Sequence, residues 1–397
     1  MKIRSVKDFY RVIFLTRDFK RKLLEKILTN YKIEKDEISQ LEKYLKVLEG
    51  ISQENGKYVL EYGAGKKSYL NLDYEIDELY KDIEYLTSSE NDFISYLAQH
   101  NYKFEEDIQA GLEFLLKPQL TTFISDRDGT VNNYCGRYNS SVQSIYNAVF
   151  LVNYAKLGHK PVILTSAPLS DIGFLDINIM PRVYFVIAGS KGREFTWNNK
   201  RYRMKLDADQ QQKIDGLNKK LQEITRQSQY EIFALIGSGL QFKFGETTIA
   251  RQDIYNSIPA NDSIEFLQKI KQLVRDIDPE KQYFSITDTG KDIEIVLNKD
   301  SNKAAEFTKG DGIEFISHKI GLNLENAHNL ICGDTTSDLA MLEYAETVSE
   351  NNYSIFVTQE EKLKLKVGRF ASKNLFVNSP DALVTILYEY SKERSKN

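Results

Sequence analysis

Two apolar runs that lie far apart in the chain each lead into a group of carboxylates. Thr121–Ile124 precedes Asp126-Arg127-Asp128-Gly129-Thr130, and Leu330–Cys332 precedes Gly333, Asp334 and Asp338. Short apolar runs of this kind are typical of buried strands. In a parallel sheet with helices on both faces, active sites lie beyond the carboxyl ends of the strands. The sequence therefore predicts that the two acidic motifs meet at one edge of one sheet.

The chain around these motifs alternates between strand and helix patterns. Strands are expected at Phe123–Ser125, Pro161–Thr165, Val183–Ala188 and Asn329–Cys332, and helices at Ser141–Leu157 and Gly312–Ile320. Such alternation predicts an α/β fold in which a doubly wound parallel sheet is covered by helices on both faces.

Residues 204–298 interrupt this alternation. Helices are expected at Asp207–Gln227 and Ser263–Arg275, and strands at Ile232–Ile236, Gln241–Ile249, Tyr283–Thr287 and Asp292–Leu297. The Thr289-Gly290 pair is a turn signal between the last two strands. An inserted α-β-β-α-β-β unit in a doubly wound domain is interpreted as a cap over the active site.

The N-terminal part of the chain carries three apolar stripes at helical spacing. They run through Ile38–Leu48, Leu72–Leu86 and Ile108–Leu115, and they predict a helical bundle whose outer surface is open to a protein partner or to self-association. Gly63–Ser68 resembles a phosphate-binding loop but has Leu60 where Gly is required, and is interpreted as a turn. The predicted parts are a helical domain (1–117), a first core segment (118–203), a cap (204–298) and a second core segment (299–397).

Composition narrows the class of protein. A net charge of -4 gives no electrostatic footprint for nucleic acid or for an anionic membrane surface. Two cysteines in 397 residues argue against a disulfide framework and fit a reducing compartment. No apolar run reaches the length that a membrane helix needs, and the N-terminus is charged. We therefore expect a cytoplasmic protein that binds neither nucleic acid nor membrane.

The acidic motifs predict phosphoryl transfer. Asp126 is the expected nucleophile, and Asp128 the general acid that protonates the leaving oxygen and then activates water. Crowded carboxylates need a cation, and Mg²⁺ prefers hard oxygen ligands. We assign it Asp126, the backbone carbonyl of Asp128 and Asp334, with Asp338 in support. Lys309 and Ser166 are expected to bind the remaining phosphate oxygens, and Thr165 is an alternative to Ser166 because strand-end register is not fixed by sequence.

In these residues the chain resembles the haloacid dehalogenase superfamily of phosphatases. Asp126-x-Asp128-Gly129-Thr130 is similar to its first motif, Ser166 to its second, Lys309 to its third, and Gly333-Asp334-x-x-Ser337-Asp338 to its fourth. The predicted insert resembles the C2-type cap of the sugar-phosphatase branch. The resemblance implies a Mg²⁺-dependent phosphatase with an aspartyl-phosphate intermediate.

Within that branch the chain resembles the trehalose-6-phosphate phosphatase family, especially its longer nematode members with an N-terminal helical domain. The likeness rests on Ala188–Glu194, Gly239–Gly245 with Ile249–Asp253, and Gly290-Lys291-Asp292-Ile293-Glu294. It implies trehalose 6-phosphate as substrate. It also implies sugar-binding roles for charged residues that can hydrogen-bond neighbouring hydroxyls, namely Lys191, Lys243, Arg251, Lys291 and Glu294.

Two other functions stay open at this point. One is hydrolysis of another sugar phosphate, such as sucrose 6-phosphate or a glycosyl-phosphoglycerate. The other is a regulator that binds a sugar phosphate without turnover. The chain also departs from sugar phosphatases at Arg127 and at Ala167-Pro168, and neither departure is expected to touch the catalytic atoms.

Overall fold

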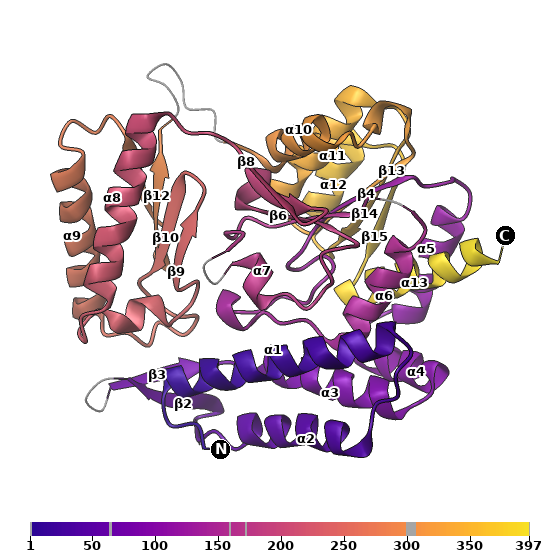
Figure 1. The fold of residues 1–397 in the computed structure, drawn as a ribbon, viewed down its shortest axis with the longest axis horizontal. Coiled ribbons are helices and arrows are strands. Elements are labelled where there is room, and N and C mark those ends of the chain that lie inside the picture. The colour runs from indigo at the N-terminus through magenta and orange to yellow at the C-terminus, as the bar shows by residue number, and fades with distance from the viewer. Residues whose placement is uncertain (1, 63–65, 159, 171–172, 299–306, 397) are drawn as a thin grey trace.

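The computed structural model describes residues 2–62, 66–158, 160–170, 173–298 and 307–396. A central sheet with its helices, an inserted sheet with two long helices, and a set of N-terminal helices form the molecule (Figure 1). The N-terminal helices lie along one side of the other two parts (Figure 1). Within the described residues, no helix combines the length and the apolar character required to cross a membrane.

The central sheet has eight strands in the order β15-β14-β13-β4-β5-β6-β7-β8. The six strands from β15 to β6 pair in parallel, whereas β7 and β8 form an antiparallel hairpin at one edge. The sheet is therefore mixed, and the prediction of a purely parallel sheet is corrected at this edge. The strands are β4 (Thr122–Asp126), β5 (Val162–Leu164), β6 (Val186–Gly189), β7 (Glu194–Trp197), β8 (Lys200–Arg203), β13 (Asn329–Gly333), β14 (Asn352–Val357) and β15 (Asn374–Val377).

Helices cover both faces of this sheet, as a doubly wound fold requires. Side chains alternate along the strands, so that Phe123 belongs to one apolar cluster while its neighbour Ile124 belongs to the other. The first cluster includes α6 (Ile145–Ala155) and α13 (Pro380–Ser395), and the second includes α10 (Lys309–Ile320), α11 (Leu339–Val348) and α12 (Glu361–Phe370). The short helix α7 (Phe174–Ile177) follows β5. The predicted α/β fold class is confirmed.

The insert has the predicted α-β-β-α-β-β order. Its four strands form an antiparallel sheet in the order β11-β12-β10-β9, and both helices pack on one face of it. The face that carries Asp292 and Glu294 is turned away from these helices. In Figure 1 the cap sheet lies between its two helices and the central sheet. The elements are α8 (Ala208–Thr225), β9 (Leu240–Lys243), β10 (Glu246–Ala250), α9 (Ala260–Ile277), β11 (Phe284–Asp288) and β12 (Asp292–Leu297).

Two predictions within the cap are corrected. Ile232–Ile236, expected as a strand, overlaps the 3-10 turn η3 (Glu231–Ala234), because a short apolar run is ambiguous between strand and helix. Gln241–Ile249, expected as one strand, is a hairpin of β9 and β10 that turns at Gly245 with φ +70°. The predicted boundary between cap and second core segment, between residues 298 and 299, borders residues 299–306, which lie outside the described residues.

Among its described residues, the N-terminal part contains five helices, and also a small antiparallel sheet that the apolar stripes did not predict. The turn predicted at Gly63–Ser68 falls partly on residues 63–65, which are not described, and its last three residues belong to β3. The helices are α1 (Val6–Leu28), α2 (Lys35–Glu49), α3 (Asp73–Thr87), α4 (Glu90–His100) and α5 (Phe104–Leu115), and the strands are β1 (Gln53–Glu54), β2 (Lys57–Tyr62) and β3 (Lys66–Leu70).

The N-terminal helices share one apolar core with α6 and α13 of the central layer. Buried charges also cross this boundary. Lys81 of α3 binds Asp381 of α13 at 2.9 Å across the boundary, and it also binds Glu78 of its own helix at 3.0 Å. Within the N-terminal part, Lys20 of α1 binds Asp82 of α3 at 2.7 Å. A buried ion pair of this kind is costly to break, because one charge is then left without a partner. The N-terminal helices are thus built into the central layer.

The N-terminal part also contacts the cap. The Tyr10 hydroxyl of α1 donates a hydrogen bond to the Leu235 carbonyl at 2.8 Å, and Lys7 forms an ion pair with Glu231 at 2.6 Å. From β3, Lys66 pairs with Asp262 of α9 at 2.5 Å. The N-terminal part therefore touches both the central layer and the cap. The cavity described below lies between these two.

Candidate active site

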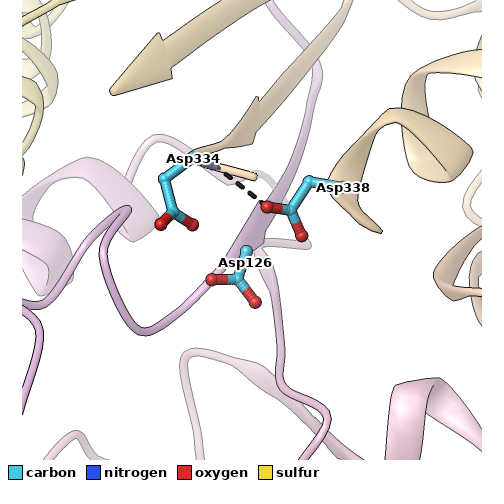
Figure 2. A group of neighbouring side chains, drawn as sticks. All are labelled: Asp126, Asp334 and Asp338. Atoms are coloured by element: carbon cyan, nitrogen blue, oxygen red, sulfur yellow. Dashed lines mark hydrogen bonds between the residues drawn. The ribbon is translucent and has the colours of Figure 1, made fainter. Parts of the chain in front are cut away.

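The two acidic motifs meet because β4 and β13 are neighbouring parallel strands. Their register pairs Leu330 with Phe123 and Cys332 with Ser125, so both chains leave the sheet at the same edge. One carboxylate oxygen each from Asp126, Asp334 and Asp338 lies within 4.8 Å of the others. Figure 2 shows the three side chains as one group. The predicted meeting of the motifs is observed in the structure.

Asp338 is held by the turn that follows β13. Its Oδ2 accepts hydrogen bonds from the backbone N–H of Asp334 at 3.1 Å and of Thr335 at 2.9 Å, the first of which is drawn in Figure 2. The Thr335 hydroxyl donates to the same oxygen at 2.8 Å. Because Oδ2 is engaged in this way, Oδ1 of Asp338 faces Lys309. The turn thus orients a buried carboxylate toward the site.

Lys309 is the first residue of α10, and Thr308 caps that helix by accepting a hydrogen bond from Asp311 N–H. The Lys309 Nζ lies 2.5 Å from Asp126 Oδ1 and 2.5 Å from Asp338 Oδ1. The side chain is only 5% exposed. A buried ammonium between two carboxylates is well placed to offset negative charge at this point. The residue expected from the third motif therefore stands beside the predicted nucleophile.

Burial and crowding shift the proton affinities of these groups. Burial raises the pKa of Asp126 well above its usual value, Lys309 opposes this rise, and the charges of Asp338 and Asp334 add to it. Burial together with the charge of Asp338 raises the pKa of Asp334 to about 7. Burial would also raise the pKa of Asp338, but Lys309 and the backbone hydrogen bonds hold it below the usual value. When all three carboxyl groups are ionised, they therefore carry more negative charge than Lys309 alone can balance.

A divalent cation with hard oxygen ligands fits this surplus of charge. The Asp126, Asp334 and Asp338 carboxylates supply an all-oxygen donor set of the kind that Mg²⁺ prefers. The backbone leaves room at this point because Gly129 has φ +88° and no side chain. A Cβ there would lie 2.7 Å from Asp334 Cγ. Thr130 donates to Asp334 Oδ1 at 3.0 Å and so orients that carboxylate.

Asp128 stands apart from the three carboxylates and is held through a single oxygen. Arg127 Nη1 donates to Asp128 Oδ1 at 2.5 Å, Ser141 Oγ at 3.0 Å and Asn132 Nδ2 at 3.4 Å. The expectation that Arg127 touches no catalytic atom is wrong. The chain turns back after Thr130, and this turn places the fully buried guanidinium against the neighbouring carboxylate.

A cavity of about 310 Å³ lies between this loop and the cap. The core contributes Asp128, Tyr138 and Ser141 to its wall, and the cap contributes Ser238, Lys291 and Asp292. Among the predicted sugar-binding residues, Lys291 lines this cavity and donates hydrogen bonds to Asp253 O at 2.7 Å and to Asn256 Oδ1 at 2.6 Å.

The other predicted cap residues lie in different surroundings. Lys243 pairs with Glu246 at 2.5 Å, and both lie close enough to Glu294 to influence its pKa, which burial raises. Lys191 also lies close enough to Glu294 to influence its pKa. Its backbone adopts the left-handed conformation, with φ 59°, shortly before β7. The Arg251 guanidinium binds Asp288 through two nitrogens and Ser263 Oγ through a third, inside the cap. These contacts place Arg251 in the framework of the cap sheet.

The second motif lies on the strand next to the nucleophile. Asp126 is in register with Leu164, and Ser166 follows two residues later as a half-buried side chain. The Thr165 hydroxyl accepts a hydrogen bond from Ala167 N–H at 3.3 Å. The Thr165 hydroxyl can still donate a hydrogen bond of its own, so the choice between Ser166 and Thr165 stays a prediction.

Several site residues escaped the sequence analysis. Asn132 and Ser141 contact Asp128, yet each is a common loop residue without a distinctive pattern. Thr130 belongs to the first motif, but its contact with Asp334 was not predicted. Asp292 had a usable signal, because it directly follows Lys291 in the Gly-Lys-x-x-Glu segment. Tyr138 and Ser238 join the cavity wall only through tertiary folding.

Comparison with known proteins adds the family. A family model described as trehalose-6-phosphate phosphatase, C-terminal, matches residues 123–383, and one described as trehalose-6-phosphate phosphatase N-terminal helical bundle domain matches residues 5–103. The chain is 29% identical over 409 residues to alpha,alpha-trehalose-phosphate synthase (UDP-forming) 1 of Aphelenchoides avenae. That alignment covers 96% of this chain and 35% of the relative, so the chain spans about a third of its length.

Two relatives are close to this chain in length. The trehalose-phosphatase of Caenorhabditis elegans is 24% identical over 427 residues, covering 98% of this chain and 97% of that protein. The trehalose-phosphatase of Brugia malayi is 25% identical over 423 residues, covering 96% and 85%. The match to the C-terminal family model contains both acidic motifs, Lys309 and the whole insert. The chain belongs to the trehalose-6-phosphate phosphatase family.

Proposed function

We propose that this protein hydrolyses trehalose 6-phosphate to trehalose and phosphate. The observation that carries the proposal is that Asp126 belongs to the buried carboxylate group, while Asp128, two residues further on, lines the cavity under the cap. Membership of the family supports the substrate. The names of two relatives of similar length, both called trehalose-phosphatase, support it further.

In the first step Asp126 attacks phosphorus and the bond to the sugar oxygen breaks. Asp128 gives its proton to that departing oxygen, so trehalose leaves as a neutral alcohol and an aspartyl-phosphate remains. In the second step Asp128 takes a proton from water, which attacks the phosphorus and frees Asp126. Lys309 and Ser166 hold the phosphate oxygens in both steps. Mg²⁺, when held by Asp126, Asp334 and the Asp128 carbonyl with Asp338 in support, supplies positive charge that offsets the phosphate dianion.

The cap is proposed to select the sugar. Lys291 lines the cavity, and Lys191, Lys243 and Glu294 lie in a connected charged group; all four are proposed to bind sugar hydroxyls. Arg251 stays a prediction, since Asp288 and Ser263 already bind its guanidinium. A closed cap would also keep water from competing with the sugar during the first step.

The test is phosphate release from trehalose 6-phosphate with and without Mg²⁺, beside glucose 6-phosphate and sucrose 6-phosphate. Asp126→Asn keeps the size of the side chain and removes the nucleophile, so its turnover should fall by at least about 1,000-fold with an unchanged thermal midpoint. Turnover that needs metal and is confined to trehalose 6-phosphate supports the proposal. Preference for another ester would reject the substrate and keep the chemistry. If the wild type released no phosphate from any of these esters, both the proposed substrate and the proposed chemistry would be rejected. That result would favour a sugar-phosphate-binding regulator.

A further inference from the structure

The loop that follows the nucleophile strand rests against a helix of the N-terminal domain. The Tyr74 hydroxyl of α3 donates a hydrogen bond to Asn132 Oδ1 at 2.9 Å. Asn132 is only 2% exposed and lies in the turn that follows Thr130. Its backbone also closes that turn, since Asn132 N–H donates to Arg127 O at 2.9 Å and Asn132 O accepts from Gly129 N–H at 2.7 Å.

The far end of the same amide faces Asp128. Asn132 Nδ2 donates to Ser141 Oγ at 3.0 Å and to Asp128 Oδ1 at 3.4 Å, and Ser141 Oγ donates to Asp128 Oδ1 at 3.0 Å. An Asn side chain has one acceptor end and one donor end. The Tyr74 hydroxyl binds the acceptor end, so the donor end is the one presented to the carboxylate. Tyr74 thereby helps to fix the orientation of the amide.

Other residues of α3 hold the same loop. Glu75 Oε1 accepts from the Ser140 hydroxyl at 2.6 Å, beside Ser141. Glu78 accepts from the Ser144 N–H at 2.6 Å and from Asn133 Nδ2 at 3.3 Å. These contacts come from one face of one helix, and Glu75 and Glu78 are buried. The loop therefore has a defined position relative to α3. Among these contacts, the one made by Tyr74 leads to Asp128 through a single residue, Asn132.

We propose that Tyr74, a residue of the N-terminal domain, is a positioning residue for Asp128 and acts through Asn132. Among the described residues, the side-chain donors to Asp128 converge on Oδ1. These donors leave the other oxygen of Asp128 available to a ligand, and Asp128 lines the cavity. The inference rests on the proposed function, because it takes Asp128 to be the group that protonates the departing oxygen.

Tyr74→Phe tests this inference in the full-length protein, because it removes one oxygen and keeps the ring. The matched control is Tyr80→Phe on the same helix, whose hydroxyl binds Glu49 at 2.5 Å on a face away from the loop. Two esters separate positioning from general damage. A sugar leaving group needs a proton from Asp128, whereas the p-nitrophenolate of p-nitrophenyl phosphate leaves without one.

We expect Tyr74→Phe to lower kcat/KM on the sugar phosphate by about tenfold and on p-nitrophenyl phosphate by less than about twofold. Tyr80→Phe should leave both values unchanged. The ratio of the two substrates, measured on one preparation, does not depend on the fraction of folded protein. Equal losses on the two esters, or no loss in Tyr74→Phe, would overturn the inference.

A double-mutant cycle gives a second and independent measurement. In an Asn132→Ala background the added Tyr74→Phe change should have no further effect on kcat for the sugar phosphate, since the connection is already broken. Full additivity of the two changes would overturn the route through Asn132. Failure of the proposed substrate is recognised separately, because the wild type would then prefer another sugar phosphate, on which both measurements are repeated.

Discussion

At the scale of single residues, Gly129 marks the closest approach of the backbone to the carboxylate group. Its φ of +88° belongs to the left-handed region that residues with a Cβ rarely adopt. The neighbouring Asp334 carboxylate also occupies the space that a side chain would need. The position therefore serves two purposes, which are the turn after β4 and the room for the acidic group.

Gly129→Ala should lower turnover by about 100-fold or more, because the added methyl displaces the Asp334 carboxylate. Gly158→Ala is the matched control, since Gly158 has the same φ of +88° with open space around it. Both variants carry the same backbone strain, of about 1–2 kcal/mol. Steady-state assays with a Mg²⁺ titration measure the effect. Equal activity in the two variants would show that the added methyl does not displace the Asp334 carboxylate and would contradict the prediction.

Much of the candidate site could be predicted from sequence because its acidic residues directly follow strands. Asp126 and Asp334 leave neighbouring strands, so the fold class alone brings them together. Arg127 and Asn132 could not be assigned in this way. Their contacts with Asp128 arise where the loop turns back on itself, and strand order does not encode that turn.

At the scale of elements, α3 completes the N-terminus of α6. Asp82 Oδ1 accepts the Ile145 N–H at 2.5 Å, and Glu78 Oε2 accepts the Ser144 N–H at 2.6 Å. The first N–H groups of a helix have no partner within that helix, and negative charge is favourable there. Burial nevertheless raises the pKa of Asp82 from 3.8 to about 6, and Lys20 only partly opposes this rise.

This shift predicts a pH dependence of stability that Asp82→Asn removes. A carboxyl group whose pKa is higher in the folded state stabilises that state when protonated, and this contribution is lost as the pH rises from about 4 to about 6. The loss in unfolding free energy caused by Asp82→Asn should therefore be about 1 kcal/mol larger at pH 5 than at pH 7.5. Urea unfolding of both proteins at the two pH values measures it. A loss that is the same at both pH values would contradict the assignment.

The elements that sequence patterns predicted best were long or strongly periodic. The stripes at Ile38–Leu48 and Leu72–Leu86 became α2 and α3, and the α-β-β-α-β-β order of the cap was predicted from similar patterns. The hairpin of β7 and β8 was missed although Asn198 and Asn199, both with positive φ, form its turn. Asn is among the residues that favour such turns. The sequence signal for this turn was therefore present, but no long apolar run stood beside it to indicate the two strands.

At the scale of the whole molecule, the N-terminal domain is part of the structure around the site. Its helices share an apolar core with α6 and α13, and its surface touches the cap through Tyr10 and Lys66. A domain that merely aided solubility would need neither contact. The N-terminal helices therefore contact both the cap and the catalytic loop.

Residues 118–397 produced alone should expose the apolar faces of α6 and α13 that the bundle covers. We expect this fragment to aggregate, or to bind a hydrophobic dye and lose its cooperative thermal transition. Size-exclusion chromatography and calorimetry of the fragment beside the full chain measure this. A monomeric fragment that melts cooperatively and keeps full turnover would show that the bundle only aids solubility or assembly.

The pairing of Lys81 with Asp381 has a consequence for synthesis on the ribosome. The two residues are 300 positions apart, so the helix that carries Lys81 is translated long before its acidic partner. Until α13 emerges, the shared apolar face of the bundle stays uncovered as well. Domains generally fold in order from the N-terminus during translation, but the apolar face of this bundle is covered only after α13 has been made. Holding chaperones therefore have a long interval in which to act on the nascent chain, and a truncation that removes α13 would leave the apolar face of the N-terminal helices uncovered.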